Sequence, residues 1–464
     1  MTIEFSKAKK LLDEHGQGDV LRFWDRLDEG QRKSLLAQVE DLDFTSLGRM
    51  GRMLEARAAS DRAGYAGITP SPVVELAGQE AAGAREAGRE ALRAGQVGVV
   101  LVAGGQGSRL GFNGPKGCFP VGPLSDATLF AIHARKILAS ERLYDTQIPF
   151  YIMTSRTNDA ATRDFFLQHN GFGLNPDRVK FFVQGMWPAL WEDGRMVLDR
   201  PGHLFMSPDG HGGTLTALLK NGMLADMASR GIETVFYFQV DNPLVEIADP
   251  AFIGLHRLQN ADMSLKVCAK RDPGEGLGVV AGKDGRHMIV EYTELTDEQK
   301  NERLPDGRLK FLYGSVAIHV FSRDFLQQEA EAELPIHLAH KKVPFCDEAG
   351  NTVKPAEPNA FKFEKFIFDV LPDAARSLNL AFLREDEFSP VKNATGSDSP
   401  ATAQRDMIRK AGRWLRECGV DVPVDASGTP LHKIEIDPCY AASPEELKAK
   451  LPAGFRVDGD VLLA

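Results

Sequence analysis

The sequence predicts an α/β fold built on a doubly wound, mostly parallel sheet, with a helical N-terminal region and a small C-terminal domain. From residue 98 onward, short and almost wholly apolar segments alternate with amphipathic segments of helical period. That alternation is typical of parallel strands joined by helices. Residues 1–93 carry helical periodicity without a convincing strand, and a polar stretch at 393–400 separates the C-terminal end of the chain.

The apolar runs are expected to be strands that are covered on both faces of the sheet, with right-handed helical crossovers between them. We expect strands at 98–103, 149–154, 179–183 and 234–240, and helices at 127–143, 159–168 and 214–229. Beyond residue 261 turn residues multiply, which predicts an antiparallel extension of the sheet.

These patterns suggest three consecutive parts. A helical N-terminal region would span 1–94, a catalytic domain 95–392 and a small α+β domain 393–464. Within the last part we expect a helix at 401–417 and a short strand at 431–436.

Composition excludes several classes of protein. The chain has 464 residues and a formal net charge of −10, which disfavours nucleic acid as a partner. No apolar run reaches the roughly 18 residues that a membrane helix needs, and Met1–Lys7 lacks the order of a signal peptide, so we expect a cytoplasmic protein. The five cysteines form no C-x-x-C pair, so we expect reduced thiols and no zinc site.

A glycine-rich turn follows the first predicted strand. It reads Gly-Gly-Gln-Gly-Ser-Arg-Leu-Gly and is followed by Pro-Lys-Gly. Backbone N–H groups free of side chains can close on an anion there, while Arg109 and Lys116 supply positive charge. The dinucleotide fingerprint does not fit, because Leu110 stands where its third glycine is required, and no P-loop motif occurs. The pattern therefore favours phosphate binding of another kind.

This loop resembles the nucleotide loop of sugar-nucleotide pyrophosphorylases, and specifically the eukaryotic-type UDP-N-acetylglucosamine and UDP-sugar pyrophosphorylases. Further segments follow in the family's order, namely S-P-D-G-H-G-G, V-D-N, V-E-Y-T-E and L-R-E-D-E-F-S-P-V-K-N. The likeness spans roughly 95–400. It implies a Rossmann-like, GT-A-like nucleotidyltransferase fold for the catalytic domain.

The resemblance implies a set of nucleotide-binding positions on the loop and at three later segments. They are Ala103, Gly104, Gly105, Gly107, Met153, Thr154, Gln184 and Gly210. From the residues alone, a solvated strand end is the better explanation for Gln184, and equally for Met153 and Thr154. A loop that starts a helix explains the glycines near 210 as well as a binding role does.

The resemblance also implies the charged machinery. Asp241, which ends a buried strand, would hold Mg²⁺, and Arg109, Lys116 and Lys392 would be catalytic. The ligands of an open parallel sheet bind beyond the carboxyl ends of its strands, which is where Asp241 is expected. An aspartate that merely closes a turn is the alternative.

The sugar-binding positions that the resemblance implies are His211, Asn242, Gly278, Glu291, Ser315, Phe366 and Phe368. Core packing is the alternative for the aromatic stripe that contains the two phenylalanines. His319 is expected to be a packed histidine. His337 and His340 are expected on a solvated helix face, since no third metal ligand is evident.

The implied reaction joins UTP and a sugar 1-phosphate to give a UDP-sugar and pyrophosphate. UTP and the sugar phosphate would be the partners, without nucleic acid or membrane, in a monomer or weak homo-oligomer. Two other classes of protein fit the sequence less well. A dinucleotide-binding oxidoreductase would need the third glycine, which this chain lacks. A UDP-sugar sensor without activity would tend to lose the cations that are present here. His211 and Ser315 stand where the N-acetylglucosamine branch has asparagine, so glucose 1-phosphate is an alternative sugar.

Overall fold

The computed structural model describes residues 3–57 and 65–464, and these form two compact units. The larger unit is made of 65–183, 215–332 and 370–464. The smaller unit is made of the described residues before 65, with 184–214 and 333–369. This division differs from the consecutive one that the sequence suggested, because the N-terminal helices are shared between the two units.

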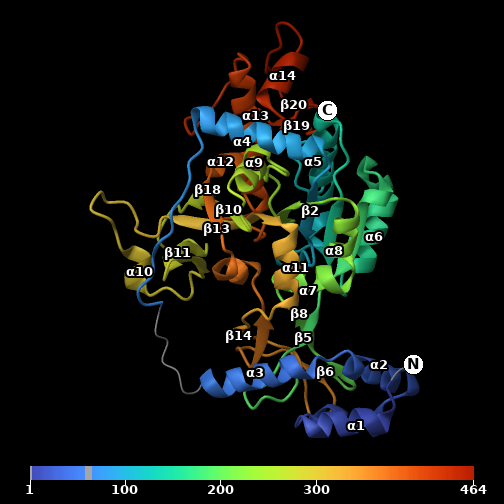
Figure 1. Cartoon of the computed structure of the whole chain (residues 1–464). Coiled ribbons are helices and arrows are strands. Elements are labelled where there is room, and N and C mark those ends of the chain that lie inside the picture. The colour runs from blue at the N-terminus through green and yellow to red at the C-terminus, as the bar shows by residue number, and fades with distance from the viewer. Residues whose placement is uncertain (1–2, 58–64) are drawn as a thin grey trace. The chain divides into compact units, whose positions relative to one another are not determined.

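The larger unit contains a sheet of ten strands (Figure 1). Its main path runs through β1 (Thr69–Pro70), β11 (Val279–Lys283), β13 (Tyr313–Ser322), β9 (Thr234–Gln239), β2 (Val97–Val102), β3 (Phe150–Thr154) and β4 (Val179–Val183). The strands β9, β2, β3 and β4 are parallel neighbours. The predicted α/β fold with a parallel central sheet is confirmed, and the carboxyl ends of these strands lie at one edge.

The antiparallel extension is also confirmed. The strands β10 (Met263–Ala269) and β13 pair antiparallel, as do β11 and β12 (Arg286–Val290), while β18 (Ser377–Ala381) joins β10 in parallel. His319 of β13 is fully buried, and its ring stacks on Tyr237 with the centroids 5.5 Å apart. It is the packed histidine that the sequence predicts.

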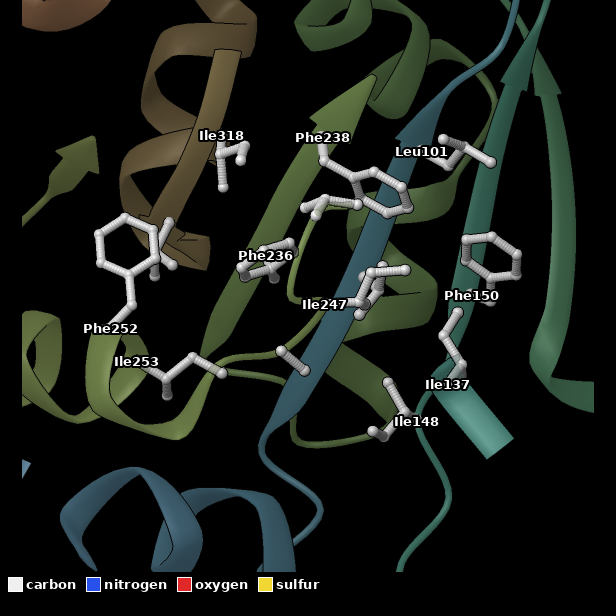
Figure 2. Close-up of a cluster of buried hydrophobic side chains, with 14 of the residues drawn as sticks. Leu101, Ile137, Ile148, Phe150, Phe236, Phe238, Ile247, Phe252, Ile253 and Ile318 are labelled. Carbon is white, nitrogen blue, oxygen red and sulfur yellow. The ribbon is translucent and has the colours of Figure 1, made fainter. Parts of the chain in front are cut away.

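The core forms where helices meet this sheet. Figure 2 shows Phe236 and Phe238 of β9 among side chains from β2, β3, α5 (Leu129–Tyr144) and α9 (Pro250–Leu258). The helices α4 (Gly78–Arg93) and α9 approach so closely that a Cβ atom at Gly254 would lie 1.7 Å from the carbonyl oxygen of Ala84. Only glycine fits this crossing.

Two predicted elements differ in the structure. The helix expected at 214–229 is broken into α7 (Gly213–Lys220) and α8 (Met223–Ser229), because Gly222 adopts a left-handed φ of 73° between them. His337 and His340 lie on the strand β14 (His337–Lys341) rather than on a helix. That strand pairs with β17 (Ala360–Glu364), whose Phe361 and Phe363 are buried on alternate positions.

The smaller unit has its own core. The helices α1 (Phe5–Glu14), α2 (Glu29–Glu40) and α3 (Phe44–Arg57) bury apolar side chains together with those of β5 (Met186–Pro188), β6 (Leu198–Arg200) and β17. The helix α2 begins with a capping box between Asp28 and Gln31.

The C-terminal end of the larger unit has a hydrophobic cluster of its own. It is built from α13 (Pro400–Glu417), β19 (Ile434–Ile436), α14 (Pro444–Lys450) and β20 (Val461–Leu463). The helix predicted at 401–417 is thereby confirmed. All five cysteines are free thiols, and within 3–57 and 65–464 no helix is long and apolar enough to cross a membrane.

Candidate active site

The glycine-rich turn follows the carboxyl end of β2, and its carbonyl groups are tied to the segment that follows β3. Asn158 donates its side-chain amide to the carbonyl oxygens of Ala103 at 2.8 Å and Gly105 at 3.2 Å. The hydroxyl of Ser155 donates to the carbonyl oxygen of Gly104 at 2.8 Å. Three successive carbonyls therefore face the same pair of side chains.

This arrangement fixes where the N–H groups point. In a trans peptide the C=O and N–H bonds are directed oppositely, and the described residues contain no cis peptide. The N–H groups of Gly104, Gly105 and Gln106 consequently point away from Ser155 and Asn158. Three such groups in a row can bind an anion.

Glycine occurs at positions 105 and 107 of this turn for different physical reasons. A Cβ atom at Gly107 would lie 2.8 Å from the Phe112 ring, so packing within the turn requires glycine there. A Cβ atom at Gly105 would have no described atom of the chain within 4 Å, and its φ is not left-handed. Glycine at 105 is therefore explained by the approach of something other than the chain itself.

Two of the predicted charged residues meet beside the turn. The Lys116 ammonium lies 3.1 Å from a carboxylate oxygen of Asp241, and their side chains are 17% and 12% exposed. Lys116 begins the short turn Lys116–Cys118, where a Cβ atom at Gly117 would lie 2.2 Å from the Phe130 ring. Close packing of Gly117 on Phe130 thus holds the lysine at this place.

The field of two lysines keeps Asp241 ionised. Burial alone would raise the pKa of Asp241, but the charges of Lys116 and Lys392 outweigh it and hold the pKa below its usual value. Attraction across 3.1 Å amounts to about 5 kcal/mol at an effective dielectric constant of about 20, but desolvating each ion costs several kcal/mol. The pair consequently adds little net stability, and a role in binding or catalysis explains it better.

Lys392 is positioned by direct contact between its own segment and that of Asp241. The N–H of Val391 donates to the carbonyl oxygen of Asp241 at 2.8 Å. Asn242 donates its side-chain amide to the Glu387 carbonyl oxygen at 2.6 Å and accepts from the Ser389 N–H at 3.1 Å. The structure thus gives Asn242 the task of joining the two segments, and its sequence-based contact with the sugar stays a prediction.

A buried charge cluster anchors the same segment. The Lys266 ammonium, 1% exposed, lies 2.5 Å from Glu387 and 2.7 Å from Asp249. Burial alone would lower the pKa of Lys266, but these carboxylates raise it. Arg109, by contrast, is exposed on the short turn Ser108–Leu110.

Three predicted sugar-binding residues come together on the antiparallel strands. The N–H of Ser315 donates to the carbonyl oxygen of Gly278 at 2.9 Å. A Cβ atom at Gly278 would lie 3.1 Å from a carboxylate oxygen of Glu291. It would also lie 2.7 Å from Cγ2 of Ile289, so the glycine leaves room for both side chains.

The predicted pair at the end of β3 is engaged within the chain. The carbonyl oxygen of Met153 accepts from the Ala103 N–H at 2.8 Å. The buried hydroxyl of Thr154 donates to Asp159 at 2.6 Å. Both residues support the glycine-rich turn, and their contact with a nucleotide stays a prediction.

The remaining predicted residues belong to the smaller unit. Gln184 is buried, and its amide donates to Asp209 at 3.3 Å. Gly210 has a φ of 84°, and a Cβ atom there would lie 2.4 Å from the Lys365 carbonyl oxygen. Backbone conformation and packing thus already require glycine at 210, whatever it binds.

His211 lies against the aromatic segment of the smaller unit. Its ring centroid is 5.3 Å from that of Phe366 and 5.6 Å from that of Phe368. Its Nδ1 accepts from the Ile367 N–H at 3.1 Å. Burial, helped by the nearby His337, lowers the pKa of His211 to about 4. His211 is therefore neutral near pH 7, with its proton on Nε2 and available for donation.

Several residues that support this site were not predicted to do so from the sequence. Asn158 and Ser155 hold the glycine-rich turn, as described above. In the smaller unit the ring of His337 stacks on Phe366 at 4.2 Å, while its Nε2 is 2.8 Å from the Asp369 carboxylate. A signal existed for the first pair only, since Ser-x-x-Asn directly follows a predicted strand end.

The chain is similar to proteins of one known family over most of its length. A family model described as UTP–glucose-1-phosphate uridylyltransferase matches residues 51–398. The chain belongs to this family. The match includes the glycine-rich turn and every predicted site residue, from Ala103 to Lys392.

Relatives within the family align over nearly the whole chain. A UDP-N-acetylhexosamine pyrophosphorylase-like protein 1 of Xenopus tropicalis is 40% identical, over 91% of this chain and 87% of its own length. UDP-N-acetylglucosamine diphosphorylase 2 of Arabidopsis thaliana is 38% identical, over 94% and 90%. The crystal structure of a Trypanosoma brucei uridine diphosphate N-acetylglucosamine pyrophosphorylase superposes with a TM-score of 0.84 at 27% identity, over 99% of this chain and 98% of that one.

Enzymes of this family generally use a divalent metal ion. Within 3–57 and 65–464, no three His, Cys, Asp or Glu side chains gather into a metal site. Asp241 is ionised and buried at a strand end beside the glycine-rich turn, as described above. A single carboxylate fits a hard cation that takes its other ligands from phosphate oxygens and water, and it does not fit zinc.

Proposed function

We propose that this uridylyltransferase joins UTP and N-acetylglucosamine 1-phosphate to give a UDP-sugar and pyrophosphate, with Mg²⁺ as its metal ion. The observation that carries the proposal is the close grouping of Lys116, Asp241 and Lys392 beside a turn with three aligned N–H groups. The names of the relatives that match nine-tenths of the chain support the sugar.

The chemistry requires two anions to meet. An oxygen of the sugar phosphate must attack the α-phosphorus of UTP, and pyrophosphate must leave. No general base is needed, because a phosphate monoester, whose second pKa is about 6, is mostly ionised near neutral pH. Catalysis then consists of alignment and charge stabilisation, as in other phosphoryl transfers.

Each part of the site has a proposed task in this reaction. The N–H groups of the turn and Arg109 hold the β- and γ-phosphates, which become pyrophosphate. Lys116 and Lys392 neutralise the charge that accumulates as the two phosphates approach one another. Asp241 would hold Mg²⁺, which when bound supplies charge neutralisation to the triphosphate.

The sugar and base have their own proposed contacts. Glu291 accepts hydroxyl hydrogen bonds from the sugar beside Gly278, whose lack of a side chain leaves room for the Glu291 carboxylate. The neutral His211 donates through Nε2 to a sugar oxygen, while Phe366 and Phe368 offer an apolar surface. Gln184 and Gly210 stay predicted contacts of the base. Ser315 stays a predicted contact of the sugar, and Met153 and Thr154 stay predicted contacts of the nucleotide.

Glucose 1-phosphate is the second candidate sugar, and one observation favours it. A histidine fixed as a donor can bond any sugar hydroxyl, whereas an asparagine amide would both donate and accept. Losing one hydrogen-bond partner for an acetamido group costs about 1 kcal/mol, which lowers selectivity several-fold. We expect both sugars to be accepted, with the acetamido sugar preferred.

The test is pyrophosphate release from UTP with a panel of sugar 1-phosphates, followed by competition between the two sugars in one reaction. Greater formation of UDP-N-acetylglucosamine from an equimolar mixture supports the proposal. Strict preference for glucose 1-phosphate would overturn the sugar assignment, and release that needs no sugar phosphate would overturn the transfer itself.

A further inference from the structure

The first residues of the glycine-rich turn do not fix their own backbone conformation. Ala103-Gly104-Gly105 contains two residues with little conformational restraint, so the peptide planes of this stretch can rotate at low cost. A rotated plane would replace an N–H group with a carbonyl oxygen on the side that faces the anion. For a phosphate, that exchange replaces attraction with repulsion. Something outside the turn must therefore fix the planes.

The segment after β3 provides this restraint. Asn158 is 1% exposed and Ser155 is fully buried, so their hydrogen bonds are shielded from water. Between them they hold the carbonyl oxygens of Ala103, Gly104 and Gly105. Each of the three peptide planes is thus held by a buried side-chain donor.

The donors are themselves held in place. The N–H of Ser155 donates to Oδ1 of Asn158 at 2.8 Å, which fixes the amide so that its nitrogen faces the turn. The N–H of Lys116 also donates to the carbonyl oxygen of Gly105, at 3.1 Å. The orientation of the amide is therefore set by the backbone.

We infer that Asn158, assisted by Ser155, is a positioning residue that holds three N–H groups of the glycine-rich turn toward the triphosphate of UTP. It acts through the backbone and does not itself touch the substrate. This inference rests on the proposed binding of triphosphate at the turn. It assigns Asn158 to the affinity for UTP and pyrophosphate rather than to the affinity for the sugar phosphate.

Two substitutions of Asn158 separate positioning from packing. In Asn158→Asp the side chain keeps its size and its acceptor for Ser155, but it loses both donations to the carbonyls. In Asn158→Ala the whole side chain is lost. We expect both variants to raise the KM for UTP and the Kd for pyrophosphate at least tenfold, with the KM for the sugar phosphate changed less than threefold.

Asn379→Ala is the matched control. Asn379 is also 1% exposed and donates its amide to a backbone carbonyl, that of Pro72 at 2.9 Å, on the strand β18. It should lower the melting temperature by a similar amount and leave the KM for UTP unchanged. If Asn158→Ala fails to fold, Ser155→Ala, which frees the Gly104 carbonyl alone, should raise the KM for UTP by a smaller factor.

The outcomes are distinguishable. A folded Asn158→Asp enzyme with the wild-type KM for UTP would overturn the inference, and so would an equal change in Asn379→Ala. A wild-type enzyme that does not use UTP would instead refute the proposed function. Direct titration of wild-type and variant proteins with pyrophosphate gives the same comparison without turnover.

Discussion

Gly105→Ala separates folding from function at the centre of the proposed phosphate site. The new methyl group would have no described atom of the chain within 4 Å, and the φ of Gly105 does not require glycine. Such a substitution usually stabilises the folded state by about 0.4–1 kcal/mol, because the unfolded chain loses freedom. Stability should therefore be unchanged or slightly higher.

Activity should nevertheless fall. The methyl group would lie beside the Gly105 N–H, in the space that a phosphate oxygen must enter. Loss of one hydrogen bond to a charged group costs about 1.5–3 kcal/mol. That range corresponds to a fall in kcat/KM for UTP of about tenfold to about a hundredfold.

The assay is initial-rate pyrophosphate release at varied UTP, with urea unfolding of the same samples. Gly83→Ala is the control, because Gly83 also has open space at its Cβ position but lies on the exposed side of α4. It should fold well and keep full activity. A stable Gly105→Ala enzyme with wild-type kcat/KM would refute phosphate binding at this turn.

Three further predictions follow from the charged and buried groups. Asp241→Asn should lower kcat by about a hundredfold or more and remove the stimulation by Mg²⁺, which metal titration of both enzymes checks; equal stimulation of the variant would sink the metal assignment. Lys392→Ala should lower kcat more than it raises KM, because charge crowding peaks in the transition state; steady-state kinetics with a change in KM alone would make Lys392 a binding residue. Burial lowers the pKa of His133 and of His256 to about 3, so the unfolded chain binds more protons than the folded one below about pH 6.5 and stability falls as pH drops. Each of the two histidines should reduce the unfolding free energy by about 2 kcal/mol between pH 8 and pH 5. Urea unfolding at several pH values checks this. A His256→Asn variant whose urea midpoint keeps the full wild-type pH dependence would contradict it.

The sequence predicted most of the elements that position the site. The strands β3 and β9 are short apolar runs buried on both faces, so composition alone identifies them. The mostly apolar β4 was also predicted, although within it only Phe182 is fully buried. The break at Gly222 was missed because the apolar period continues through it, while the backbone there turns left-handed. The strand β14 was missed because its sequence, His-Leu-Ala-His-Lys, is short and has no strong period.

The supports of the site were harder to predict. Strand-end position predicted where Asp241 lies, and its role stays a prediction. The partners of Asn158 and Asn242 are backbone carbonyls in other segments. A carbonyl group is present at every residue, so no sequence pattern marks the one that a side chain will bind. The smaller unit could not be foreseen either, since it gathers three stretches that are distant in the chain.

The most direct test of uridylyl transfer follows phosphorus nuclei during the reaction. UTP, N-acetylglucosamine 1-phosphate, Mg²⁺ and the enzyme are mixed, and ³¹P signals of all species are recorded over time. The UDP-sugar and pyrophosphate should appear in equal amounts as both substrates disappear, and neither should form with the Lys116→Met, Asp241→Asn double variant at a comparable rate. Pyrophosphate formed together with UMP, without any UDP-sugar, would contradict the account.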